Sequence, residues 1–102
     1  MAKVDMARMR EGAGVATSRL RALANEDRLM LLCQLSQGEH SVGELESLLD
    51  IRQPTLSQQL GVLRNEGLVS TRREGKYIYY AVAEPDVLML LKTLYDLYCP
   101  KD

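Results

Sequence analysis

The chain has 102 residues, enough for one compact domain and too few for two, and its hydrophobic content of 46% and charged content of 26% are typical of soluble globular proteins. No apolar run is long enough to span a bilayer and no signal-peptide segment is recognisable, so we expect a cytoplasmic protein whose Cys33 and Cys99 are normally reduced. The net charge of −1 argues against a uniformly basic nucleic-acid-binding surface.

The first part of the chain is expected to form an arm followed by two helices. Residues 1–14 are polar and contain two glycines, so we predict a flexible, frayed or loosely helical arm there and place the domain itself at residues 15–99. Apolar residues recur at helical spacing over residues 15–24. Asn25 is a suitable N-cap for a second helix over about residues 26–37, which a glycine then ends.

The next segment has the pattern of two short helices joined by a tight turn. Ser41 and Glu44 have the spacing of a capping box at the start of a third helix, over residues 42–50. A turn at residues 51–53 leads to a fourth helix over residues 54–65, whose first residue is a proline.

The period of the apolar pattern then changes from helical to extended. Residues 68–82 contain two β-prone runs separated by the sequence REGK, which predicts a hairpin with Gly75 in its turn. A last helix is expected over residues 84–98. The order ααααββα predicts a mainly α fold with a β-hairpin wing, the winged helix-turn-helix.

The fourth predicted helix has one apolar face and one polar face almost without charge. Leu56, Leu60 and Leu63 share the apolar side, and Gln58 lies opposite them. A solvated helix face is usually rich in Glu and Lys, so Thr, Ser and Gln at these positions favour contact with a partner. Their hydroxyls and amides match the donors and acceptors of DNA base edges. A polar face that is merely solvated is the alternative interpretation.

Basic residues gather in the same part of the chain. Residues 52–76 contain five basic and two acidic residues, whereas the remainder carries a net charge of −4. A basic segment on an acidic body is typical of a local nucleic-acid-binding surface. The candidate DNA-contacting residues are Arg52, Gln53, Thr55, Ser57, Gln58, Gln59, Arg72, Arg73, Lys76 and Tyr77.

Residues 41–82 resemble the ArsR/SmtB family of bacterial transcriptional repressors, and the resemblance extends over about residues 16–99. Besides 22-ALANEDRLMLLCQL-35, it is carried by Gly43, Glu44, Leu45, Thr55, Leu56, Ser57, Gln58, Leu60, Leu63, Arg64, Gly67, Leu68, Val69, Arg72, Gly75 and Tyr80. The resemblance implies a homodimer that binds an inverted-repeat operator in double-stranded DNA. It also implies that the first and last helices form the dimer interface.

The metal-sensing members of that family use cysteines in the third helix or Asp and His residues in the last helix. This chain has no cysteine in the third helix and no histidine in the last one, and His40 is its single histidine. Two distant cysteines and one histidine do not supply a closed zinc site, so we expect no metal and no other cofactor. A metal-responsive repressor is the less favoured interpretation.

The two cysteines have two interpretations each. From the residues alone, Cys33 reads as a small buried hydrophobe and Cys99 as an inconsequential terminal residue. However, a cysteine in the second helix together with a C-terminal Tyr-Cys is similar to the BigR/SqrR branch of the family, whose dithiols sense reactive sulfur species or oxidants. That resemblance implies that Cys33 and Cys99 are redox-sensing residues, and that linking them switches operator binding.

Two other classes of function stay open. The similar HlyU branch carries such cysteines but acts chiefly by displacing a silencing protein, which makes the cysteines secondary. A small thiol oxidoreductase is disfavoured, because the chain lacks a C-x-x-C motif, a glycine-rich phosphate loop and a Cys/His pair of recognisable spacing. We therefore expect a regulator and not an enzyme.

Overall fold

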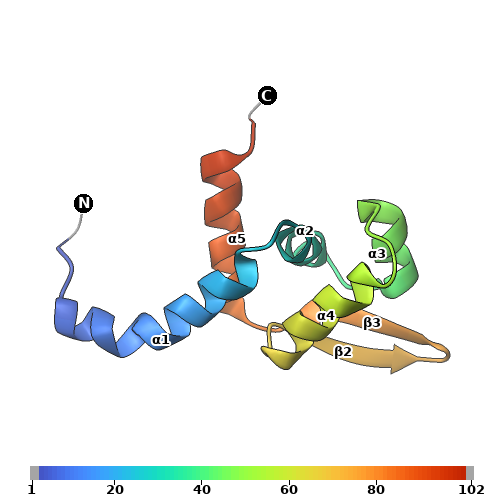
Figure 1. The fold of residues 1–102 in the computed structure, drawn as a ribbon, viewed down its shortest axis with the longest axis horizontal. Coiled ribbons are helices and arrows are strands. Elements are labelled where there is room, and N and C mark those ends of the chain that lie inside the picture. Colours follow the sequence, from blue (N-terminus) through green and yellow to red (C-terminus); the bar gives the residue numbers. More distant parts are fainter. Residues whose placement is uncertain (1–2, 101–102) are drawn as a thin grey trace.

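The computed structural model describes residues 3–100 and has the predicted winged helix-turn-helix architecture. Figure 1 shows the hairpin, α3 and α4 on one side of the molecule and α1 on the other. The elements in chain order are α1 (Met6–Leu23), α2 (Glu26–Leu35), β1 (His40–Ser41), α3 (Val42–Leu49), α4 (Thr55–Asn65), β2 (Val69–Glu74), β3 (Tyr77–Val82) and α5 (Pro85–Tyr98).

The first helix begins much earlier than the sequence pattern predicted. The carboxylate of Asp5 accepts hydrogen bonds from the backbone N–H groups of Ala7 and Arg8, at 3.0 and 3.3 Å, and so caps a helix that starts at Met6. Residues 6–14, which we expected to belong to an arm, are therefore helical. The two glycines in this stretch lower helix propensity but do not interrupt α1, because glycine in a helix interior costs only about 1 kcal/mol.

The helix-turn-helix is built by local signals that the sequence contains. Ser41 Oγ accepts a hydrogen bond from the backbone N–H of Glu44, and the Glu44 carboxylate accepts one from the backbone N–H of Ser41, which completes the predicted capping box. Asp50 ends α3 in the left-handed conformation, with φ of 53°. The fourth helix begins at Thr55, one residue later than predicted, with Pro54 as its N-cap.

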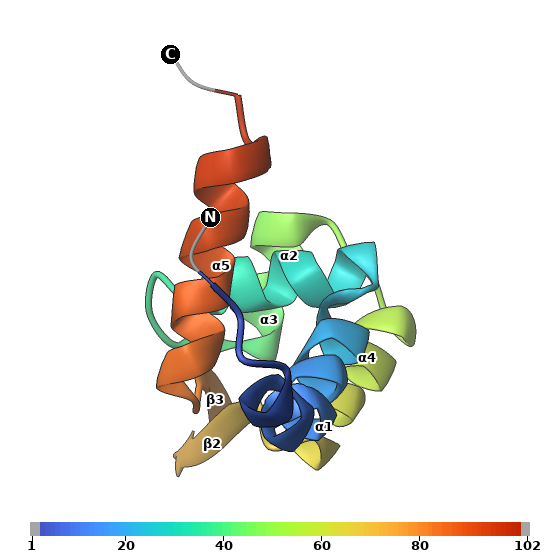
Figure 2. The ribbon, with the colours of Figure 1, turned by 90° about the vertical axis from the view of Figure 1, so that its left-hand side faces the viewer.

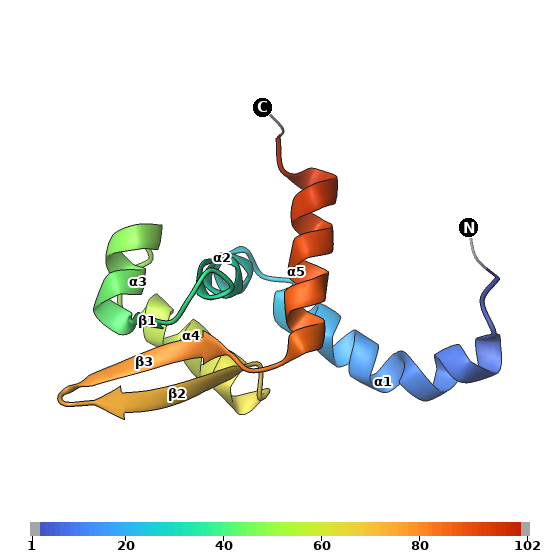
Figure 3. The ribbon, with the colours of Figure 1, turned by 180° about the vertical axis from the view of Figure 1, so that it is seen from behind.

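The sheet has three strands, one more than predicted. The two-residue strand β1 pairs antiparallel with β3, and β3 pairs with β2, so the strand order is β1-β3-β2. Gly75 has φ of 62° in the predicted hairpin turn, a conformation that glycine adopts without steric cost. Figure 3 shows the β2–β3 hairpin extending away from the helices as a wing.

The core is formed mainly by leucines from α2, α3 and α4, closed by the root of the hairpin and the start of α5. Its fully buried side chains are Leu31, Leu32, Leu45, Leu56, Leu60, Leu63, Leu68 and Val87. Most of α1 and the outer half of α5 lie outside this core, as Figures 1 and 2 show. Across residues 3–100, no helix is both long and apolar enough to traverse a bilayer.

Candidate nucleic-acid interface

Helix α4 has the two faces that its sequence predicted. The side chains of Leu56, Leu60 and Leu63 are at most 2% exposed, whereas Ser57 and Gln58 are exposed on the opposite side. The leucines fix the rotation of the helix, because any other rotation would expose them to water. The hydroxyl and amide face is thereby presented to solvent.

The turn before α4 continues this polar face. Gln53 Oε1 accepts hydrogen bonds from the backbone N–H of Ser57, at 3.2 Å, and from its hydroxyl, at 2.5 Å. This contact orders the Gln53 side chain beside the first turn of the helix. Arg52 is exposed next to it, and Thr55 is half-buried in the first turn.

Gln59 differs from its neighbour Gln58, because it bonds to the protein itself. Its Oε1 accepts a hydrogen bond of 3.0 Å from Nη1 of Arg28, on α2. The same guanidinium donates to the backbone carbonyls of Ala22 and Arg21, at 2.7 and 3.1 Å. Arg28 therefore joins α4 to the end of α1. Sequence reasoning missed this residue, since nothing in the local pattern around residue 28 indicates a partner on α4.

The wing presents its basic residues in two different ways. Arg73 and Lys76 are exposed and make no ion pair within residues 3–100, while Lys76 Nζ lies 5.6 Å from the ring centre of exposed Tyr77. Arg72 has carboxylate partners on both sides, Glu39 and Glu74. Hydrogen bonds from Arg72 lower the pKa of Glu39, and the two carboxylates raise the pKa of Arg72. Of the wing's basic residues, Arg73 and Lys76 are thus the ones open to a phosphate.

Each cysteine lies near the C-terminal end of a helix, Cys33 in α2 and Cys99 directly after α5. Cys33 lines a cavity of about 790 Å³ together with Leu91, Lys92 and Tyr95 of α5. Cys99, directly after α5, is exposed. Burial raises the pKa of the half-buried Cys33 thiol, and the charge of a Cys99 thiolate raises it further. Both are free thiols in this structure.

Comparison with known proteins identifies the family. A model of the arsR family of bacterial regulatory proteins matches residues 25–71. A biofilm growth-associated repressor from Agrobacterium fabrum is 61% identical over 80 residues, which cover 78% of this chain and 68% of that protein. The chain belongs to the ArsR family. It is therefore a transcriptional regulator and not an enzyme.

Solved structures agree with this assignment for the ArsR-family chain as a whole. The transcriptional repressor BigR from Xylella fastidiosa superimposes with a TM-score of 0.91 and 45% identity, over 96% of this chain and all of that one. HlyU from Vibrio cholerae superimposes with a TM-score of 0.84 and 42% identity, over 90% of this chain and all of that one. The winged helix predicted from the sequence is thus confirmed by fold comparison.

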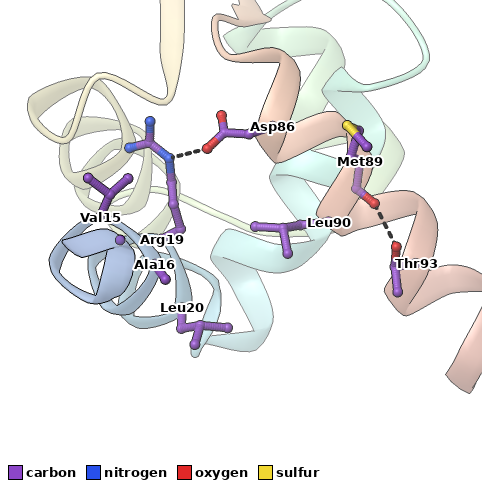
Figure 4. Close-up of a pocket in the computed structure, with 9 residues that line it drawn as sticks. Val15, Ala16, Arg19, Leu20, Asp86, Met89, Leu90 and Thr93 are labelled. Atoms are coloured by element: carbon purple, nitrogen blue, oxygen red, sulfur yellow. Dashed lines mark hydrogen bonds and ion pairs between the residues drawn. The ribbon is translucent and has the colours of Figure 1, made fainter. Parts of the chain in front are cut away.

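A surface groove separates α1 from α5 in this ArsR-family chain. Figure 4 shows Leu90 of α5 pointing toward Ala16 and Leu20 of α1, and Val15 and Met89 also line the groove. The groove has a volume of about 630 Å³ and is almost entirely apolar. At one end of the groove, Arg19 of α1 forms an ion pair with Asp86 of α5, with 3.1 Å between Arg19 Nε and Asp86 Oδ2.

No metal-binding cluster is found among the residues that the structure describes. His40, the lone histidine, begins strand β1, where its Nδ1 is 3.8 Å from a carboxylate oxygen of Glu44 and its Nε2 is 3.4 Å from the amide nitrogen of Gln34. The ring therefore lies among residues that order the start of α3.

Proposed function

We propose that this ArsR-family chain is a cytoplasmic repressor that binds an inverted-repeat operator as a homodimer, and that linking Cys33 to Cys99 weakens the binding. The observation that carries the DNA-binding part is the exposed, uncharged polar face of α4 beside a basic wing. The closeness of the fold to that of the BigR repressor supports the same role.

The α4 side chains are proposed to read base edges in the major groove. Half-buried Thr55 and exposed Ser57 and Gln58 lie in the first turn of α4, and a glutamine amide can bond to adenine in two places. Arg52 and Gln53 precede the helix, where the turn meets a phosphate strand. Contacts of this kind fix the register of a recognition helix on the duplex.

The wing is proposed to supply the sequence-independent part of the affinity. Arg73, Lys76 and Tyr77 are exposed near the hairpin turn, where a phosphate backbone or the adjacent minor groove would be met. Each phosphate that a basic side chain neutralises releases counterions, so binding should weaken steeply as salt is raised. The overall charge of −1 is no obstacle, because the positive charge is local.

The homodimer is proposed to form through α1 and α5. Large apolar side chains on these helices stay exposed in the single chain, among them Val15, Leu20, Met89 and Leu97. Exposed apolar side chains gathered on two helices are unusual on a monomer and typical of a subunit interface. A two-fold axis between two chains would present two α4 helices to the two halves of an inverted repeat.

The sulfur chemistry is proposed to begin at Cys99, the exposed thiol. Its thiolate attacks the outer sulfur of a low-molecular-weight persulfide. That sulfur is transferred to Cys99, which becomes a persulfide, and the rest of the small molecule leaves as the corresponding thiol. Cys33 then attacks the inner sulfur of this persulfide, which is Cys99 Sγ. The attack forms the Cys33–Cys99 disulfide and releases the outer sulfur as hydrogen sulfide. The raised pKa of the half-buried Cys33 thiol keeps it protonated, which leaves the first attack to the exposed Cys99. One of the solved structures similar to this chain is that of reduced HlyU from Vibrio cholerae.

A link between these cysteines would tie α2 to the helix that we assign to the dimer interface. The separation of the two α4 helices depends on that interface. Half-sites on DNA lie about 34 Å apart or at a multiple of it, so a small change in separation would weaken operator binding. The switch is then a change in population between a DNA-competent and an incompetent geometry.

Gel-shift titration of the reduced and the polysulfide-treated protein tests the proposal. We expect treated wild type to bind its operator at least tenfold more weakly, with mass spectrometry showing a Cys33–Cys99 link. Cys33→Ser and Cys99→Ser are the matched controls, whose affinity should not change on treatment. Equal affinities of reduced and linked wild type would show that the cysteines do not control binding.

A second candidate role is activation by displacement of a silencing protein, with inert cysteines. The observation that favours it is a 41% identity with the transcriptional activator HlyU of Vibrio cholerae, over 96% of this chain and 91% of that protein. An absence of any cysteine modification after polysulfide or peroxide treatment, with DNA binding intact, would favour this role over the thiol switch.

A further inference from the structure

Arg72 is surrounded by acidic and aromatic groups of its own chain. Its Nε lies 3.0 and 2.9 Å from the two carboxylate oxygens of Glu39, and its Nη2 also donates to that carboxylate. Its Nη1 lies 2.7 Å from Glu74 Oε2. The guanidinium carbon is 4.8 Å from the centre of the Tyr79 ring. We call these four residues the Arg72 clamp.

The clamp joins β2 and β3 to the residue that precedes β1. Tyr79 of β3 is paired with Arg72 of β2 on one side and with Ser41 of β1 on the other. Glu39 directly precedes β1, so the Arg72 side chain crosses over the Tyr79 ring to reach it. One side chain therefore connects the wing to the turn between α2 and β1.

The charges of the clamp oppose a phosphate at this position. Two carboxylates face one guanidinium, which leaves a local net charge of −1. A phosphate that approached Arg72 would have to displace a carboxylate that already accepts charge-assisted hydrogen bonds from two of its nitrogens. Successive strand residues point to opposite faces, so Arg73 lies on the other face of β2, away from both carboxylates.

We propose that Arg72 is not a phosphate contact but a positioning residue: it fixes the wing against Glu39, and the fixed wing places Arg73 and Lys76 on the DNA. The inference rests on the proposed DNA-binding function. It revises the prediction from the sequence that Arg72 touches DNA, and it adds Glu39, an acidic residue outside the basic segment, to the residues that determine affinity.

Salt-dependent DNA binding separates a positioning residue from a phosphate contact. Arg73→Gln, the matched control, should reduce the slope of log affinity against log salt by about 1.8, as for two lost phosphate contacts, one in each protomer of the proposed homodimer. Arg72→Gln and Glu39→Gln should each weaken operator binding about two- to fivefold, in the range of an exposed ion pair, with the slope unchanged. The double variant should bind like either single variant. If Arg72→Gln lowers the slope as Arg73→Gln does, and Glu39→Gln strengthens binding, the inference is wrong.

Exchange of the two charges provides a rescue experiment. The double substitution Glu39→Arg with Arg72→Glu keeps the ion pair between positions 39 and 72 but loses the one with Glu74, so it should regain part of the affinity that Arg72→Gln loses. A phosphate contact would behave in the opposite way, because the exchanged pair puts a carboxylate where the cation was. Binding of the exchanged pair that is weaker than that of Arg72→Gln would overturn the inference.

Hydrogen exchange on the protein without DNA tests the clamp separately from the proposed function. Amide protection in β2 and β3 should fall in Arg72→Gln and Glu39→Gln and stay at the wild-type level in Arg73→Gln. Unchanged protection in all three variants would contradict the clamp even if the protein binds DNA. Wild-type protein that binds no duplex with sequence preference, but shows the expected protection pattern, would contradict the proposed function alone.

Discussion

Two neighbouring glutamines on α4 show how much a single side-chain environment decides. Gln58 is exposed on the polar face, whereas Gln59 is half-buried and accepts a hydrogen bond from Arg28. Both side chains are amides with the same capacity to form hydrogen bonds to a base. The difference arises from the arginine on α2, which already occupies Gln59. We therefore assign base reading to Gln58 and a bracing contact to Gln59.

Substitution of these two glutamines should affect different properties, DNA discrimination for Gln58 and folding stability for Gln59. Gln58→Ala is expected to reduce discrimination between operator and unrelated duplex about tenfold or more, with stability unchanged, because one base contact is lost. Gln59→Ala should lower the free energy of unfolding by about 1 kcal/mol and leave discrimination intact. Competition binding and urea unfolding measure the two effects. Intact operator preference in Gln58→Ala would show that the reading face is assigned wrongly.

The raised pKa of Cys33 predicts its response to pH. Burial and the nearby charge of Cys99 both disfavour the thiolate, so Cys33 keeps its proton to a higher pH than an ordinary cysteine. The midpoint of its alkylation rate against pH should lie above the ordinary cysteine value. Cys99→Ser should move that midpoint down, since it removes one of the two causes. Mass spectrometry of alkylated protein measures this, and a midpoint below the ordinary value would contradict the prediction.

The same shift has a consequence for stability. A pKa raised by folding means that the folded state favours the protonated thiol, so the free energy of unfolding should fall as pH rises through that raised pKa. Cys33→Ser removes the group and should flatten this part of the stability curve.

At the scale of the element, α3 depends on its N-terminal cap more than on its length. The helix has only eight residues, and its first turn is closed by the reciprocal bonds of Ser41 and Glu44. The same two residues connect it to strand β1, which ends at Ser41. The cap therefore fixes where the sheet stops and where the helix-turn-helix begins.

Ser41→Ala should lower the free energy of unfolding by about 1 kcal/mol, because the backbone N–H of Glu44 loses its partner. Ser47→Ala, on the exposed face of the same helix, is the control and should change stability by less than about 0.5 kcal/mol. Urea unfolding followed by circular dichroism measures both. Equal effects of the two substitutions would show that the cap is not what stabilises α3.

At the scale of the whole molecule, the single chain leaves apolar side chains of α1 and α5 exposed to solvent. Its dimensions are 49 × 35 × 21 Å, and α1 and α5 carry large apolar side chains away from the core. A chain of this size has a thin core, so burial of these helices against a second copy would add stability as well as symmetry. Stability and DNA binding should therefore both depend on protein concentration.

Met89→Glu should disrupt the proposed dimer. The residue is 73% exposed on α5 beside the apolar groove, and a carboxylate there would be buried without a partner in the assembled state. Analytical ultracentrifugation should show a shift to monomer, and operator affinity should fall at least tenfold. Leu48→Glu, an exposed hydrophobe on α3, is the control and should remain dimeric. A dimeric Met89→Glu variant would place the interface elsewhere.

The amino-acid sequence by itself determined the features that depend on neighbours a few residues apart. The capping box of α3, the leucine face of α4, the hairpin turn at Gly75 and the start of α5, which lies at Pro85 where residue 84 was predicted, all follow from local spacing and local backbone preference. The start of α1 was also encoded locally, by the N-cap Asp5, but the two glycines that follow it led us to predict an arm there. The polar face of α4 was predictable because the period of a helix fixes which side chains oppose the leucines.

Only the tertiary structure decided which polar and charged side chains already have a hydrogen-bond or ion-pair partner within the chain. Strand β1 has two residues and no period of its own, so it exists only because β3 offers an edge to pair with. That pairing brings Glu39 to Arg72, 33 residues later in the chain, and the packing of α2 on α4 brings Arg28 to Gln59. Charge and hydrogen-bonding capacity can be counted from composition, but whether a partner takes them up is a matter of distance in the folded chain. The physical reason is that an ion pair depends on separation in space, which sequence separation does not set.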